Sequence, residues 1–276
     1  MLEWLILLKA IILGLVEGLT EFAPVSSTGH MIIVDDVWLK SKQLMPDEAA
    51  NTFKVVIQLG SILAVVIVFK ERLVELSGLS RRSKQGKGQR LGLGKVFVGL
   101  LPAGILGILL KDLIDDYLFS VETVLIGLVL GSITMLLADR YAPKKEAAIS
   151  MDEMTYKQAW LVGCIQCFSL WPGFSRSGAT ISGGVMFGMS HRSAADFTFI
   201  MAIPIMAGAS FISLLDHWHV FTLEMMPFFV VGFLSAFGFA LLSIRFFLKL
   251  INRLKLKPFA IYRLILALAI YLVLFS

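Results

Sequence analysis

Long apolar runs separated by short polar segments make up most of this chain, and they predict membrane-spanning helices. Six runs contain few charged residues and approach the length of about 20 residues that crosses a bilayer as a helix. They cover residues 53–69, 96–110, 121–138, 195–214, 227–247 and 259–275. The composition agrees, with 57% hydrophobic and 16% charged residues and a mean hydropathy of +0.82. We therefore expect an all-α polytopic membrane protein, with residues 1–276 forming a single membrane domain.

The first apolar segment differs from these spans because it carries charges and then breaks. Residues 4–22 read as a helix with Glu17 and Glu21 four residues apart, which places both carboxylates on one helical face. A charged side chain deep in a bilayer costs at least about 2.5 kcal/mol. The helix breaks at Pro24, and a short helix over 26–36 follows. The pattern predicts a re-entrant broken-helix hairpin with a functional site inside the membrane.

A simpler reading of the same stretch stays open. The proline and the hydroxyl residues that follow it are also typical of a polar turn just outside the bilayer. In that case Ser26 or Thr28 would serve as the N-cap of a helix.

The opening pattern returns in the second half of the chain. At one constant offset without gaps, five pairs of positions correspond: Gly14 and Gly163, Glu17 and Gln166, Ser26 and Ser175, Thr28 and Ser177, and Gly29 and Gly178. Three apolar spans follow each copy. The chain is thus predicted to be a duplication, with repeat 1 at about 1–138 and repeat 2 at about 156–276, each half comprising one re-entrant hairpin and three transmembrane helices.

An odd number of spans per copy requires the second copy to be inverted in the membrane. The distribution of charge agrees with this. The basic segments 70–95, 139–158 and 245–257 fall on one side, which the positive-inside rule assigns to the cytoplasm. The acid-leaning segments 31–51, 111–120 and 215–226 fall on the other side. The two hairpins then enter from opposite faces, and their tips meet near the midplane, as in many membrane binding sites.

The second hairpin has the composition of a phosphate site. Arg176 is its one basic residue, and it follows a glycine- and serine-rich turn that opens a helix. A guanidinium fork and a helix N-terminus both favour phosphate oxygens. The expected substrate-binding residues of this turn are Gly173, Ser175, Ser177 and Thr180. Alternatively, Arg176 only neutralises Glu17 or Glu21, as a buried ion pair.

The first hairpin supplies acids, hydroxyls and a histidine. Glu17 and Glu21 would repel a phosphate, so either a divalent cation (Mg²⁺ or Ca²⁺) sits between them and the substrate, or one of them is protonated or acts as a base. Three hydroxyl residues are candidate nucleophiles, and the histidine is a candidate general acid or base. They are Ser26, Ser27, Thr28 and His30, of which Ser26 and Thr28 are also expected to contact substrate.

These motifs resemble a known family. Glu17-x-x-x-Glu21 followed by Pro24-Val-Ser26-Ser27-Thr28-Gly29-His30, and later Pro172-Gly-Phe-Ser175-Arg176-Ser177-Gly-Ala-Thr180, are similar to the two signatures of bacterial undecaprenyl-diphosphate phosphatases, also called bacitracin resistance proteins. The resemblance runs along essentially the whole chain, including the span that contains Gln58-Leu-Gly-Ser-Ile-Leu-Ala.

The resemblance implies a multi-pass enzyme of the bacterial plasma membrane with its active site open to the outer face. It would hydrolyse undecaprenyl diphosphate to undecaprenyl phosphate and inorganic phosphate, which recycles the lipid carrier for cell-wall synthesis and confers bacitracin resistance. A divalent cation would be required. By resemblance the catalytic set is Glu17, Glu21, Ser27, His30 and Arg176, with Glu17 and Glu21 as the metal ligands.

The expected partners are a polyprenyl diphosphate and membrane lipids, with a homodimer as one alternative for the assembly. We do not expect nucleic-acid binding, because the net charge of +5 follows the predicted membrane topology. We also expect no secretory signal peptide, since the first residues lack a basic segment and a cleavage site.

A transporter is the competing class of function. Inverted repeats with broken helices at the midplane are a transporter architecture, and such a site could carry a lipid phosphate across the bilayer. The two classes differ in one requirement. A transporter needs no nucleophile, so replacement of Ser27 or His30 would then change only binding.

Overall fold

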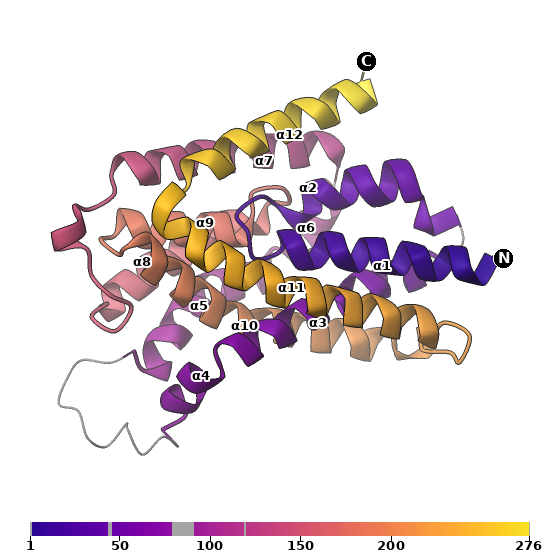
Figure 1. Ribbon diagram of the computed structural model, residues 1–276, viewed down its shortest axis with the longest axis horizontal. Helices are drawn as coiled ribbons and strands as arrows, with labels where there is room; N and C mark the ends of the chain where they lie inside the picture. Colours follow the sequence, from indigo (N-terminus) through magenta and orange to yellow (C-terminus); the bar gives the residue numbers. More distant parts are fainter. Residues whose placement is uncertain (1, 44–45, 79–90, 119, 276) are drawn as a thin grey trace. The chain divides into compact units, whose positions relative to one another are not determined.

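The computed structural model describes residues 2–43, 46–78, 91–118 and 120–275, and in these residues the regular secondary structure is helical (Figure 1). The helices of the first half are α1 (Leu2–Thr20), α2 (Ser27–Met31), α3 (Asp47–Val68), α4 (Lys70–Leu76), α5 (Leu93–Leu109), α6 (Lys111–Tyr117) and α7 (Val121–Arg140). Those of the second half are α8 (Tyr156–Gln166), α9 (Arg176–Met186), α10 (His191–Asp216), α11 (Met226–Leu254) and α12 (Lys257–Phe275). The prediction of an all-helical chain is confirmed.

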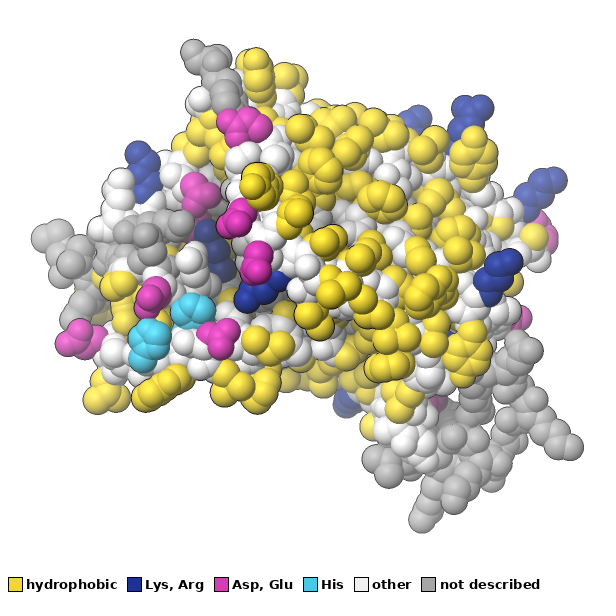
Figure 2. Space-filling model, turned by 180° about the vertical axis from the view of Figure 1, so that it is seen from behind, with side chains coloured by type: hydrophobic (Ala, Val, Ile, Leu, Met, Phe, Trp, Pro, Cys, Tyr) yellow, Lys and Arg dark blue, Asp and Glu magenta, His cyan; other side chains and the backbone are white. Residues whose placement is uncertain are grey.

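Five of the described helices are long and apolar enough to cross a membrane: α3, α7, α10, α11 and α12. They account for five of the six predicted spans. The sixth, predicted at 96–110, is α5, which is apolar but only 17 residues long and therefore lies at the short limit for a span. Figure 2 shows hydrophobic side chains spread over much of the visible surface, as expected of a surface that faces lipid.

The chain divides into two compact units that each draw segments from both halves of the sequence. The first comprises Met1–Ala23, Ser27–Val68 and Ala202–Phe247. The second comprises Pro24–Ser26, Phe69–Met201 and Leu248–Ser276.

In the first unit, α1 packs closely against α11 because small residues line the contact. A Cβ on Gly14 would lie 2.6 Å from the carbonyl oxygen of Gly232, so neither helix could approach as closely with a larger residue there. The hydroxyl of Ser235 donates to the carbonyl of Ile11 at 2.8 Å, and that of Ser243 donates to Leu19 at 2.9 Å. These contacts fix α1 up to the point where it breaks.

In the second unit, the second hairpin packs against helices of the first half of the chain. A Cβ on Gly163 of α8 would lie under 3.0 Å from the carbonyl oxygen of Gly99 in α5. Helix α9 packs on α7, and α7 packs on α12. The beginning of α12 is held by Asp139 of α7, whose carboxylate accepts the backbone N–H groups of Leu256 and Lys257 at 3.0 and 2.7 Å.

Segments predicted as polar connections contain helical residues; in 245–257, for example, α11 continues to Leu254. Within 70–95, residues 70–76 form α4, where Arg72 donates to Glu75 at 2.9 Å and also bonds Asp152. Within 111–120, residues 111–117 form α6. Within 31–51, α3 begins at Asp47. Composition pointed to loops there because short helices with many charges lack a long apolar stripe. The remaining basic part of the first connection, residues 79–90, lies outside the described residues.

Candidate active site

The first helix ends four residues before Pro24, and its end positions both acids. Glu17 lies in the last turn of α1 and is 5% exposed. The hydroxyl of Thr20 bonds back to Val16 at 2.6 Å, and the backbone N–H of Glu21 still donates to the carbonyl of Glu17 at 2.9 Å. Glu21 therefore continues the helical turn, and the chain then leaves the helix.

Across this break, Ser27 returns to Glu21. Ser27 is the first residue of α2, and its Oγ donates a 2.7 Å hydrogen bond to Oε2 of Glu21. A hydroxyl bonded to a carboxylate within this distance is the usual geometry of a nucleophile and its general base. The predicted catalytic residues Glu21 and Ser27 are thus brought into direct contact.

The other predicted residues of the first hairpin flank this pair. Ser26, immediately before α2, is 3% exposed and has a φ of 71°, which is in the left-handed region. Thr28 and His30 are half-buried residues of α2. His30 is three residues after Ser27, which places the two side chains on one face of the helix.

The turn before α9 has a backbone that requires special residues. Gly173 has a φ of 88°, and a Cβ there would lie under 3.0 Å from the carbonyl oxygen of Val124 in α7. Trp171 anchors the turn by donating its indole N–H to the carbonyl of Thr123 at 2.8 Å. Ser175 has a φ of 75° and is the N-cap of α9, with its Oγ accepting the N–H of Gly178 at 3.2 Å.

The remaining predicted residues of this turn surround the start of α9. Arg176 is its first residue, half-buried, and its Nη1 lies 3.5 Å from the carbonyl oxygen of Thr198 as a donor. The hydroxyls of Ser175 and Ser177 are 3.2 Å apart. Thr180 directs its hydroxyl to the carbonyl of Arg176 at 2.9 Å, so its one donor is used within the helix. An arginine, two hydroxyls and a capped helix N-terminus are thus gathered in one turn.

The predicted site residues of the two hairpins lie in different compact units. Glu17, Glu21, Ser27, Thr28 and His30 belong to the first, while the turn with Arg176 belongs to the second, as does Ser26. Within each unit the structure brings the predicted residues together.

Glu17 and Glu21 are also the predicted ligands of a divalent cation. The described residues contain no group of three or more His, Cys, Asp or Glu side chains that could hold a metal ion. One or two carboxylates are nevertheless the usual protein contribution to a Mg²⁺ site in which substrate phosphates supply further oxygens. The two acids at the end of α1 fit a cation that is shared with a phosphate substrate.

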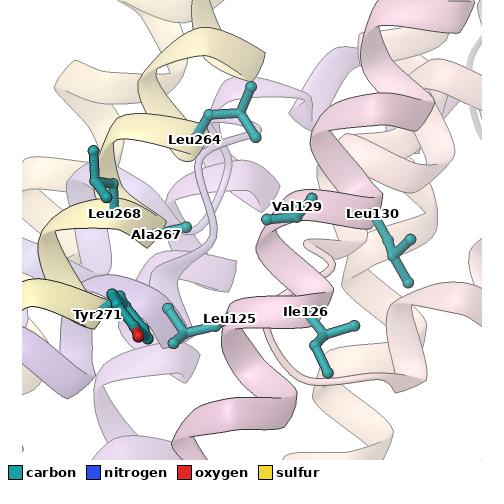
Figure 3. Close-up of a pocket in the computed structure, with 8 residues that line it drawn as sticks. All are labelled: Leu125, Ile126, Val129, Leu130, Leu264, Ala267, Leu268 and Tyr271. Carbon is teal, nitrogen blue, oxygen red and sulfur yellow. The ribbon is translucent and has the colours of Figure 1, made fainter. Parts of the chain in front are cut away.

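An apolar groove lies between α7 and α12 in the second unit. It has a volume of about 450 Å³ and is lined by Leu125 and Val129 of α7 and by Leu264, Ala267, Leu268 and Tyr271 of α12, among others (Figure 3). Val124 and Gly127 of α7, which do not line the groove, contact Gly173 and Pro172 of the turn before α9.

Sequence reasoning missed one residue that contacts this turn. Arg263 of α12 is fully buried and donates to the carbonyl oxygens of Gly173 and Phe174, both at 2.9 Å. The available signal was a lone arginine within an apolar span, since such residues rarely occur without a specific role.

Known proteins resemble this chain over nearly its full length. The family model described as "Bacitracin resistance protein BacA" matches residues 10–269. The undecaprenyl-diphosphatase of Geobacillus sp. (strain WCH70) is 66% identical over 269 residues, which cover 98% of each chain. That of Geobacillus thermodenitrificans (strain NG80-2) is 66% identical over 274 residues, 99% of this chain and 100% of the relative. That of Bacillus subtilis (strain 168) is 62% identical over 269 residues, 97% of this chain and 98% of the relative. The chain therefore belongs to the bacitracin resistance protein BacA family.

Proposed function

We propose that this protein is an integral membrane phosphatase that hydrolyses undecaprenyl diphosphate to undecaprenyl phosphate and inorganic phosphate. The substrate follows from relatives that carry the name undecaprenyl-diphosphatase and align over nearly the full chain. The reaction regenerates the lipid carrier for cell-wall synthesis and counteracts bacitracin. The observation that carries the chemistry is the hydrogen bond between Ser27 and Glu21, since it joins a nucleophile to a base.

In the proposed reaction, the Oγ of Ser27 attacks the terminal phosphorus. Its proton passes to Glu21, which already accepts its hydrogen bond. The bond from phosphorus to the bridging oxygen breaks, and undecaprenyl phosphate leaves with the bonding electron pair. A water molecule then hydrolyses the phosphoserine and releases inorganic phosphate. His30, on the same helical face as Ser27, would take the proton from this water. In the alternative route His30 activates a water that attacks phosphorus directly.

The turn before α9 would bind the terminal phosphate. Arg176 offers a guanidinium fork, and Ser175 and Ser177 offer hydroxyls beside the N-terminus of α9. These donors would stabilise the charge that develops on the equatorial oxygens during transfer. The proposal therefore assigns the residues of both hairpins to one substrate, on the basis of their complementary chemistry.

Glu17 and Glu21 would hold the divalent cation, Mg²⁺ or Ca²⁺. When bound, the cation would offset the charge of the diphosphate. Glu17 is nearly buried, and a shared cation explains why a second carboxylate is placed one helical turn from the base.

We also propose the inverted-repeat arrangement, and two features support it. The first is reciprocal packing. Gly14 of the first hairpin contacts Gly232 in α11, the second span of the second half, while Gly163 of the second hairpin contacts Gly99 in α5, the second span of the first half. The second is the shared left-handed backbone of Ser26 and Ser175 at equivalent positions. Both are expected if two similar halves exchange their hairpins.

The orientation and the position of the tail complete the proposal. The basic connections at 139–158 and 245–257 would face the cytoplasm, with the active site open to the outer face of the bacterial plasma membrane. Part of the polyprenyl tail would lie in the groove between α7 and α12, because this groove is apolar (Figure 3) and α7 also contacts the turn before α9.

The proposal is tested by phosphate release from a polyprenyl diphosphate by the purified protein in detergent. The wild type and Arg176→Ala are compared with and without a chelator, and folding of each sample is checked by circular dichroism and thermal unfolding. Release that requires both the cation and Arg176 supports the enzyme and its proposed site. Well-folded wild-type protein that releases no phosphate contradicts it, and a lipid-flipping assay in vesicles then tests the transporter alternative.

A further inference from the structure

The buried residue Arg263 has no evident role in the proposed chemistry, yet it occupies a costly position. It lies in α12, within an apolar membrane-spanning helix, and it is 0% exposed. No carboxylate lies within ion-pair distance of it in the part of the chain that the structure describes. A buried guanidinium without a counter-charge is strongly unfavourable unless its donors are satisfied, so the contacts that replace water indicate its role.

The contacts of Arg263 converge on the turn before α9 and on α7. Its Nη2 donates to the carbonyl oxygens of Gly173 and Phe174, both at 2.9 Å. The same nitrogen lies 3.3 and 3.2 Å from the carbonyl oxygens of Gly127 and Leu128 in α7. Its Nη1 also lies 3.4 Å from the Sδ of Met135 in α7. The guanidinium therefore connects the turn to α7.

Two glycines make room for this guanidinium. A Cβ on Gly131 of α7 would lie under 3.0 Å from Nη2, and a Cβ on Gly178, in the first turn of α9, would lie 2.9 Å from Nη1. Arg263 thus lies between α7 and the first turn of α9, directly behind the segment that Ser175 and Arg176 occupy.

The direction of the two carbonyl groups has a consequence for the turn. In a planar trans peptide the C=O and N–H groups point in opposite directions. With the carbonyl of Phe174 held toward Arg263, the N–H of Ser175 must point away from it. The same bond restrains the backbone of Ser175, which has the unfavourable φ of 75°. A strained residue persists only where its surroundings hold it in place, and Arg263 supplies that restraint.

We propose that Arg263 is a positioning residue, which holds the turn at Gly173–Arg176 in the conformation that binds the terminal phosphate. This inference rests on the proposed function, since it concerns the same turn. Arg263 does not contact the phosphate in this account. It acts through the backbone, and its positive charge behind the turn adds to the attraction for an anion.

Arginine is required for this role and lysine is not equivalent. The planar fork of arginine spans the carbonyls of the turn and those of α7 together, whereas an ammonium is a compact point charge that loses its proton readily when buried. Arg263→Lys is therefore the informative variant, because it keeps the size and basic character of the side chain while removing the fork. Arg263→Met removes both.

The test uses the full-length protein in detergent and measures kcat, KM and inhibition by inorganic phosphate. Since displacement of a binding group by about 1 Å costs about 100-fold in rate, we expect kcat/KM to fall by about 10- to 100-fold in Arg263→Lys and further in Arg263→Met. Inhibition by phosphate should weaken in parallel. Arg192→Lys is the matched control, because Arg192 also bonds a helix carbonyl, that of Leu248 at 2.9 Å, but does not touch the turn. Its kinetics should remain those of the wild type.

Hydrogen–deuterium exchange gives a readout that does not depend on activity. Amide exchange in the peptide that covers residues 171–178 should rise in Arg263→Lys relative to the wild type, with other segments unchanged. Wild-type phosphate inhibition together with wild-type exchange of this peptide in Arg263→Lys would overturn the inference. If the wild type releases no phosphate, the proposed function fails, while the exchange measurement still decides whether Arg263 holds the turn. If Arg263→Met does not fold, Arg263→Lys decides alone.

Discussion

Ser26 and Ser175 have nearly the same left-handed backbone, with φ values of 71° and 75°, although they stand in opposite halves of the chain. Each immediately precedes a helix, α2 after Ser26 and α9 after Ser175. This conformation is uncommon for residues other than glycine and costs of order 1–3 kcal/mol. The repeated choice of serine therefore indicates that the hydroxyl is needed at these turns, as the cap that Ser175 forms with Gly178 illustrates.

The first prediction separates the backbone strain of Ser175 from its cap. Ser175→Gly removes the strain and, as an N-cap, glycine is only a few tenths of a kcal/mol worse than serine. Ser175→Ala keeps the strain and loses the cap, which costs about 1 kcal/mol. We expect Ser175→Ala to be the less stable variant by about 1–2 kcal/mol, measured by reversible unfolding in mixed detergent micelles. Equal stability of the two variants would show that the left-handed backbone carries no cost.

Both variants should lose phosphatase activity. The reason is that each removes a proposed phosphate donor. The two variants should thus differ in stability although both lose activity. A glycine variant with wild-type activity would remove Ser175 from the substrate-binding residues.

Much of the architecture could be predicted from the sequence because membrane helices are long and apolar. The break of the first helix before Pro24, the helix that follows the turn at Ser175 and the offset that pairs Ser26 with Ser175 all followed from local residue chemistry. The short helices α4 and α6 did not, because a segment of seven residues with several charges has too little apolar periodicity to be distinguished from a loop.

The candidate site was predictable as a set of residues but not as a set of contacts. Ser27 and Glu21 were both named from the motif, yet five residues of irregular chain lie between them, and only the turn geometry determines that their side chains meet. Arg263 was missed for a related reason. Its contacts with Gly173 and Gly127 depend on three helices packing together, and no sequence spacing encodes such packing.

The second prediction concerns the nucleophile. Ser27→Ala should lower kcat by about 1,000-fold or more, since it removes the attacking oxygen, and Glu21→Gln should lower it by about 100- to 10,000-fold because the general base is lost. The double variant should be little worse than Ser27→Ala alone, because two residues that act as one unit are not additive. Phosphate release with radiolabelled substrate provides the measurement.

Trapping of the intermediate provides the control for this prediction. Acid quenching of the wild type during turnover should leave label on the protein, and mass spectrometry should place it on Ser27. A phosphorylated residue elsewhere would exclude Ser27 as the nucleophile. Rapid turnover with no phosphoenzyme and an active Ser27→Ala variant would favour the water activated by His30.

The third prediction tests the close packing of α8 on α5. Gly163→Ala places a methyl group against the backbone oxygen of Gly99, which cannot move aside as a side chain would, and overpacking of this kind costs about 1–3 kcal/mol. Gly104→Ala is the matched control, because a Cβ at Gly104 of α5 meets nothing within 4 Å. Thermal unfolding in detergent should show a lower midpoint for Gly163→Ala only. Equal midpoints for the two variants would contradict the close approach of these helices.

The fourth prediction concerns the cation. Removal of divalent ions with a chelator should abolish phosphate release, and added Mg²⁺ or Ca²⁺ should restore it. Glu17→Gln should raise the concentration of cation needed for half-maximal activity by about tenfold or more, since a neutral amide is a weaker ligand than a carboxylate. Activity that is unchanged by the chelator, or a Glu17→Gln variant with wild-type cation dependence, would remove Glu17 from the metal site.

The last prediction addresses the groove between α7 and α12. Val129 lines it from α7, so Val129→Trp should fill part of the volume of about 450 Å³. If the polyprenyl tail lies there, KM for undecaprenyl diphosphate should rise by about tenfold, while KM for a diphosphate with a tail of two or three isoprene units should change little, because burial of each additional methylene contributes about 0.8 kcal/mol. Ile133→Trp is the matched control, because Ile133 lies one turn further along α7, is 45% exposed and does not line the groove. A parallel rise of KM for long and short substrates, or the same rise in Ile133→Trp, would place the tail outside this groove and in the surrounding lipid.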